Sequence, residues 1–168
     1  HRLLSTTLRH TGECAVPGFT NWAPASLTVS NGWIRFPADG FTLAVTNDLL
    51  IQGTGGRLEL GGGVWDTNTM REISRYWHWS ATNGPTVTVG GNLILTNSGQ
   101  LVVYSGPTNA AGIDVGARVD VAGDMTLGAD CWVYPWCHPF DGSYPEFRMK
   151  NLYIPATNSG FNADAVGW

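Results

Sequence analysis

One short phrase recurs along this chain and constrains its fold more than any other feature. An Asn or Asp precedes a short apolar run in the copies at Val45–Ile51, Val89–Leu95 and Val121–Leu127. Met149–Ile154 is a shortened copy, and Val29–Ile34 is a more distant relative. Repetition on this scale is typical of stacked architectures, in which each repeat packs against its neighbours. We therefore expect each copy to mark one coil of a solenoid.

The segments around the phrase have the character of short strands. An apolar residue follows the central apolar position of most copies by about eight residues: Phe41, Leu58, Leu101, Val133 and Phe161. Runs such as Thr86–Val89 and Arg118–Val121 alternate apolar with polar residues and are rich in β-branched side chains, which favours strands over helices. Gly and Asn pairs between the runs suit turns.

The copies are unevenly spaced, which a solenoid accommodates by placing extra residues in loops outside the coils. We expect such insertions near residues 61–84, 105–116 and 134–144. Residues 27–168 are then solenoid repeats, and residues 1–26 form an irregular or capping segment. We also expect the chain to be a segment of a longer protein.

Two all-β folds fit these patterns. In a parallel β-helix, or β-solenoid, equivalent residues of successive coils stack about 4.8 Å apart. In an antiparallel β-sandwich, Gly90–Gly91 and Ser98–Gly99 would be hairpin turns. The strands are very short for a sandwich, and hairpins do not require a repeating unit of several strands. We predict the β-helix and keep the sandwich as the alternative.

The pattern at Val89–Val103 resembles the β-helical passenger regions of bacterial autotransporters and filamentous adhesins. The resemblance covers roughly residues 27–60 and 86–160. It implies a right-handed parallel β-helix on a bacterial surface or in extracellular material, and it implies no catalytic residues. The aromatic insertions depart from the plainest coils of this kind.

Composition disfavours two classes of partner. Charged residues make up 13% of the chain, the net charge is −4, and Lys150 is the only lysine, so the basic surface of a nucleic-acid binder is not expected. No apolar run approaches the roughly 20 residues that span a bilayer, so we expect no membrane span.

Three cysteines leave the pairing open. A disulfide between Cys131 and Cys137 is possible across a small loop, with Cys14 then free or paired outside the chain. The alternative is that the cysteines are small apolar groups in the core. Their spacing carries no zinc signature, and we expect no metal and no cofactor.

The Asn or Asp of the phrase recurs at Asp48, Asn92, Asp124 and Asn151. In stacked coils these four positions form a ladder at one corner. A structural ladder of turn caps is favoured over a calcium site, because acids and amides alternate and no calcium-binding nonapeptide is present.

The chain has eight tryptophans, which is a high number for 168 residues. They either cover a sheet face or form a platform for sugar rings or a protein partner. The candidate binding residues are Trp65, Trp77, Trp79, Trp132 and Trp136.

These observations predict a secreted or cell-surface element with a structural or adhesive role, which self-associates end to end into filaments or surface layers. The alternative is a carbohydrate-binding module that uses tryptophan-rich loops to hold cell-surface glycans. A polysaccharide lyase or hydrolase is less favoured, since Arg118 and Asp120 fit a solvated strand face and the motifs of pectin-degrading hydrolases are missing.

Overall fold

The computed structural model describes residues 5–9, 13–15, 18–61, 65–66, 71–72, 83–107, 115–138 and 142–163. Within these residues every regular element is a β-strand, and there is no helix. The first sheet contains β1 (Ser5–Arg9), β4 (Ser26–Ser30), β7 (Leu49–Gln52), β12 (Leu93–Thr96), β15 (Met125–Leu127) and β18 (Leu152–Tyr153). The second sheet contains β2 (Glu13–Ala15), β5 (Trp33–Phe36), β8 (Arg57–Leu60), β13 (Gln100–Tyr104), β16 (Trp132–Trp136) and β19 (Gly160–Phe161). The third sheet contains β3 (Asn21–Trp22), β6 (Thr42–Val45), β11 (Thr86–Val89), β14 (Val115–Val121) and β17 (Tyr144–Arg148). A separate pair is formed by β9 (Trp65–Asp66) and β10 (Arg71–Glu72).

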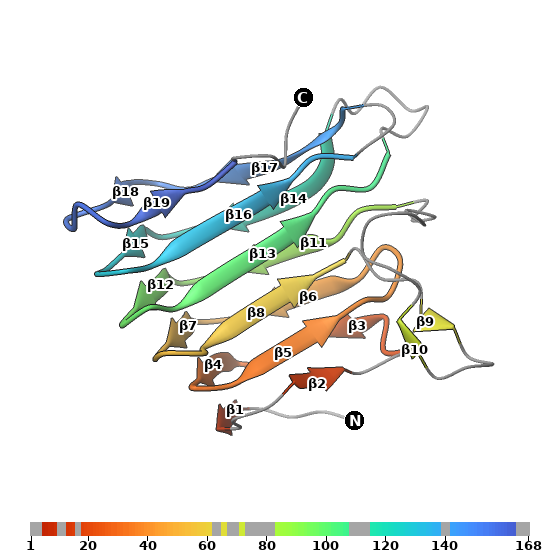
Figure 1. The fold of residues 1–168 in the computed structure, drawn as a ribbon, viewed down its shortest axis with the longest axis horizontal. Coiled ribbons are helices and arrows are strands. Elements are labelled where there is room, and N and C mark those ends of the chain that lie inside the picture. The colour runs from red at the N-terminus through yellow and green to blue at the C-terminus, as the bar shows by residue number, and fades with distance from the viewer. Residues whose placement is uncertain are drawn as a thin grey trace.

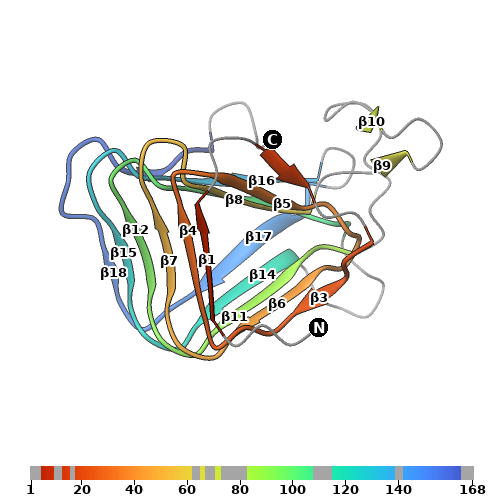
Figure 2. The same ribbon diagram turned by 90° about the horizontal axis from the view of Figure 1, so that it is seen from below.

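The chain visits the first, second and third sheets in the same order on every turn, so one coil contributes one strand to each sheet (Figure 1). Neighbouring strands in all three sheets run parallel, as between β4 and β7 or β8 and β13. Viewed from below, the coils superimpose as nested triangles (Figure 2). The parallel β-solenoid is therefore confirmed, and the antiparallel sandwich is wrong; only the β9–β10 pair is antiparallel among the described strands.

Register explains the repeated phrase. Leu27, Leu49, Leu93 and Met125 occupy paired positions in the first sheet, and all four side chains are fully buried. Each apolar residue thus packs between its counterparts in the coils above and below. Alternation sends every second residue of a strand inward, so apolar rows from the three sheets meet in one continuous core.

One alignment of the phrase is wrong. Aligning Val29–Ile34 with the later copies equates Trp33 with Leu49, but Trp33 lies in the second sheet, where it pairs with Arg57. The true counterpart of Leu49 is Leu27, one strand earlier. The two turns look alike in the sequence, because Asn31–Gly32 before the second sheet and Gly91–Asn92 before the first sheet both precede an apolar run.

The N-terminal segment is not wholly irregular. β1, β2 and β3 lie within residues 1–26 and pair in parallel with β4, β5 and β6, so they form a first coil. Ser5–Arg9 contains one apolar residue in five positions, and a strand of this composition gives almost no periodic signal.

The long connections all leave from one corner of the triangle. A bare coil measures 22 residues, the separation of the stacked Ser30 and Gln52, whereas later coils measure 44, 32 and 27 residues. The extra residues lie between β8 and β11, between β13 and β14, and between β16 and β17, always where the second sheet passes to the third. The last insertion is shorter than expected, since its first residues belong to β16.

Candidate functional site

The Asn and Asp residues of the phrase form a ladder along the corner before the first sheet. Oδ1 of Asp48 accepts the backbone N–H of Asn92 at 2.7 Å, and Oδ1 of Asn92 accepts the backbone N–H of Asp124 at 3.0 Å. Nδ2 of Asn151 donates to Oδ1 of Asp124 at 2.7 Å. Each bond joins one coil to the next, so the ladder staples the turns together. No group of three or more potential ligands positioned to hold a metal occurs in the described part of the chain.

The ladder also explains the glycine in the phrase. A Cβ placed on Gly91 would collide with Oδ1 of Asp48, and one on Gly123 would come too close to Oδ1 of Asn92. Glycine precedes the ladder residue because the side chain of the coil below occupies that space. The phrase is therefore the signature of a packed turn.

The possible disulfide is not formed. Cys131 and Cys137 are free thiols that flank β16, and the extended chain between them spans about 20 Å at roughly 3.3 Å per residue. A disulfide requires Cα atoms less than about 7 Å apart. Sγ of the buried Cys131 instead donates to the carbonyl of Ala129 at 3.3 Å, and burial raises the pKa of both thiols. The side chain of Cys14 lies outside the described residues.

The candidate tryptophans do not gather into one described platform. Trp132 and Trp136 lie on a strand, β16, rather than in a loop, and both are half-buried on the outer face of the second sheet. The ring of Trp136 stacks on Tyr104 at a centroid distance of 5.6 Å. The side chain of Trp65, and Trp77 and Trp79 entirely, fall outside the described residues.

A buried ion network lies on the same outer face and was missed in the sequence. Glu59 is fully buried; its Oε1 accepts Nε of Arg35 at 3.0 Å, and its Oε2 accepts Nε1 of Trp33 at 3.1 Å. Arg57 contacts the same oxygen through Nη2 at 3.1 Å and places its guanidinium 5.0 Å from the centroid of the Trp33 ring.

This network behaves as a structural unit. Among the described residues, the donors to the carboxylate come from the neighbouring strand or from its own, and the Glu59 side chain is fully buried. The sequence signal for this network is the presence of charged residues in two short strands: Arg35 in β5, and Arg57 and Glu59 in β8. Alternation places those residues outside the core, but only the register shows that they meet.

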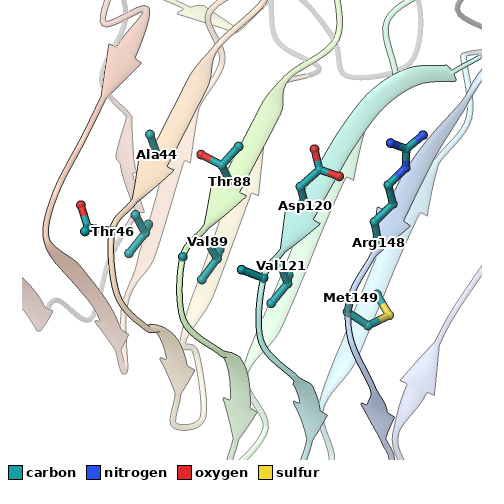
Figure 3. Close-up of a pocket in the computed structure, with 11 residues that line it drawn as sticks. Ala44, Thr46, Thr88, Val89, Asp120, Val121, Arg148 and Met149 are labelled. Carbon is teal, nitrogen blue, oxygen red and sulfur yellow. The ribbon is translucent and has the colours of Figure 1, made fainter.

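The third sheet carries an open recess among the described residues. A groove of about 650 Å³ crosses β6, β11, β14 and β17 where these strands turn towards the first sheet. Ala44, Thr88, Asp120 and Arg148 occupy paired positions on adjacent strands and project from the same face (Figure 3). Val119 and Val121 of β14 are buried, so the predicted outward face for Asp120 is correct.

Three of the four charged side chains beside this groove form ion pairs with one another. Glu146 receives both nearby arginines, with Nη2 of Arg148 at 2.9 Å and Nε of Arg118 at 3.5 Å. Asp120 pairs in register with Arg148 of the adjacent strand but forms no ion pair with any described residue. The four charges of the cluster sum to zero, and the carboxylate of Asp120 is the one left without a salt bridge there.

The C-terminal end of the stack exposes apolar side chains. Leu152 belongs to the row of Leu49 and Leu93, which are fully buried, yet it is 42% exposed. Phe161 continues the row of Val133, which is also fully buried, and is 36% exposed. The exposed large apolar side chains of the described residues all belong to this end: Tyr144, Leu152, Tyr153, Ile154 and Phe161.

Comparison with protein-family models, curated proteins and solved structures found no match for this chain. In the described residues, no helix has the length and apolar character needed to cross a membrane. The functional argument therefore rests on the fold, on its surfaces and on the pattern of the sequence.

Proposed function

We propose that this chain is a structural or adhesive element of a secreted or cell-surface bacterial protein, and that it associates end to end through its terminal coils. The winding we propose is right-handed, as in nearly all parallel strand crossovers. The resemblance to adhesin coils supports the extracellular placement. The assembly mechanism rests on the geometry of the ends.

The apolar row exposed on the last described coil is the observation that supports this proposal. Each Leu or Met of this row from Leu27 to Met125 is buried under the following coil, whereas Leu152 is 42% exposed, so a further coil, for example that of another copy, can stack on it. Covering a leucine or phenylalanine completely is worth about 1.5–3 kcal/mol. Leu152 is 42% exposed and Phe161 is 36% exposed, so a coil stacked on them would recover roughly two fifths of that free energy for each, about 0.5–1.3 kcal/mol.

The two ends of the stack present the edges of different strands. β17, β18 and β19 form the edges of the three sheets at one end, and β1, β2 and β3 form those at the other. An edge strand presents unpaired N–H and C=O groups that can pair with another strand. The two ends are different surfaces, so contact between copies is head to tail, and such contacts extend into filaments when they do not close.

A charge-insertion variant tests the assembly. Leu152→Lys combined with Ile154→Lys places two cations on the exposed end, where both native side chains are at least 40% exposed. Thr88→Lys combined with Thr126→Lys adds the same charge on lateral faces and serves as the matched control. Sedimentation velocity and negative-stain electron microscopy over a concentration series measure the assembly state.

We expect the wild-type chain and the lateral control to form longer particles as concentration rises. The end variant should remain monomeric, with a urea midpoint close to that of the wild type because the substituted side chains are already exposed. A wild-type chain that stays monomeric at every concentration would contradict end-to-end association. So would filaments formed equally by the end variant.

A further inference from the structure

The groove on the third sheet is built from the same positions of successive coils. Residues 44–46, 88–90 and 120–122 supply one section each, and Arg148 with Met149 supplies the fourth. Successive sections are one rung apart, about 4.8 Å, so the groove runs along the solenoid axis for roughly 14 Å. It is therefore an elongated site with a repeat, suited to an extended polymer.

Its lining combines an apolar floor with a few polar groups. The accessible part of this floor is Ala44, Ala122 and Met149, because Val45, Val89 and Val121 beneath it are buried in the core; Thr46 and Thr88 are exposed along it. Asp120 and Arg148 stand side by side at one end (Figure 3). Ligand sites generally join an apolar surface to a small number of placed polar groups.

The polar groups suit vicinal hydroxyls. A carboxylate accepts two hydrogen bonds and a guanidinium donates in a fixed fork, so Asp120 and Arg148 together can hold a diol. The apolar floor can take the C–H face of a sugar ring. The rung spacing is close to the length of one pyranose residue in an extended chain.

The charges that line the groove favour a neutral saccharide over one made of uronates. Arg148 is already held by Glu146, and the groove offers no cation free of a carboxylate partner among the described residues. Asp120 has no ion pair there and the charges of the cluster sum to zero, so a chain of uronates would meet a carboxylate with no net positive charge to balance its own. A neutral saccharide meets no such cost.

A peptide is a poorer occupant. Backbone N–H groups along the groove are used between coils: that of Thr46 donates to Pro24, that of Gly90 to Val45 and that of Ala122 to Val89. An extended peptide binds a sheet mainly through free main-chain groups at an edge. The groove offers side chains and no such edge.

We propose that this groove binds a neutral oligosaccharide lying along the solenoid axis, with Asp120 and Arg148 holding its hydroxyls. The groove opens on a lateral face and reaches the last described coil at Arg148, but it includes none of the exposed apolar side chains of that end, so it does not depend on end-to-end association. It is also distinct from the tryptophans of the second sheet.

Titration of the whole chain with three probes tests the proposal. Cellohexaose and N-acetylchitohexaose are the neutral probes, and hexagalacturonate is the charged comparison. Backbone amide shifts in NMR spectra report where each probe binds. Thr88→Trp fills the groove at an exposed position, Thr126→Trp makes the same change on the first sheet, and Asp120→Ala removes the carboxylate.

We expect at least one neutral probe to shift groove residues, and hexagalacturonate to bind more weakly. Thr88→Trp should abolish these shifts, Thr126→Trp should preserve them, and Asp120→Ala should weaken binding by about tenfold or more, the cost of a hydrogen bond to a charged group. Absence of binding by both neutral probes would overturn the proposal, as would tighter binding of hexagalacturonate. Binding that survives Thr88→Trp would place the saccharide elsewhere, for example on Trp132 and Trp136, and would equally refute it.

Discussion

Replacing Glu59 by Gln tests whether the buried network of the second sheet stabilises the fold. The carboxylate is fully buried, and so is the side chain of Arg35, which is 3% exposed. Glu59→Gln keeps the shape but removes the charge that balances two guanidinium groups. Breaking a buried ion pair by removing one partner costs about 3–5 kcal/mol.

This cost should be visible in urea. The free energy of unfolding of a domain is typically about 5–15 kcal/mol, so the substitution removes a large share of it. With a urea dependence of about 1–3 kcal/mol per molar, the unfolding midpoint should fall by roughly 1–5 M. Circular dichroism during urea titration measures that midpoint.

Glu146→Gln is the matched control. Glu146 also binds two arginines, Arg118 and Arg148, but its side chain is 29% exposed and that of Arg148 is 56% exposed. Exposed ion pairs contribute about 0–1 kcal/mol, so this variant should unfold close to the wild type. A Glu59→Gln variant as stable as Glu146→Gln would refute the assignment of Glu59 as a structural charge.

Three further predictions concern the core, the ladder and the cysteines. Leu93→Ala, between Leu49 and Met125, should cost about 2–5 kcal/mol in urea unfolding, whereas Thr88→Ala at an exposed position should cost far less. Asn92→Ala should cost about 1 kcal/mol because the N–H of Asp124 loses its acceptor, and Asn92→Asp should retain most of the stability. In a Cys14→Ser background, Cys137 should react with a maleimide faster than the buried Cys131; because burial raises the pKa of both thiols, both rates should keep rising with pH beyond the range in which an exposed thiol is fully ionised. Equal rates for the two cysteines would contradict the burial of Cys131.

The repeated phrase predicts the stacking of the coils because each strand of a solenoid pairs only with the equivalent strands of the neighbouring coils. Leu49, Leu93 and Met125 share an alternating apolar pattern with an Asn or Asp directly before it, so their stacking could be predicted from the sequence. The alignment failed at Trp33, where a similar turn occurs at another corner. Turn chemistry repeats at each corner of the triangle, and the sequence alone does not say which corner a turn occupies.

The surfaces were harder to predict. Arg35 and Glu59 are 24 residues apart, and their contact depends on the pairing of β5 with β8. The groove likewise exists only when Thr88, Asp120 and Arg148 are brought into adjacent rungs. The tryptophans drew attention in the sequence because of their number, whereas the groove is lined by common residues whose position alone distinguishes them.

The placement of the insertions links the fold to these surfaces. Extra residues leave only between the second and third sheets, so the corner between the third and first sheets keeps short turns in every described coil. The groove follows that corner, and no insertion interrupts it in the described coils. An insertion at residues 46–48 would block the groove while leaving the flanking strands β6 and β7 in place. Length variation at one corner and a constant surface at another can therefore coexist in a single stack of coils.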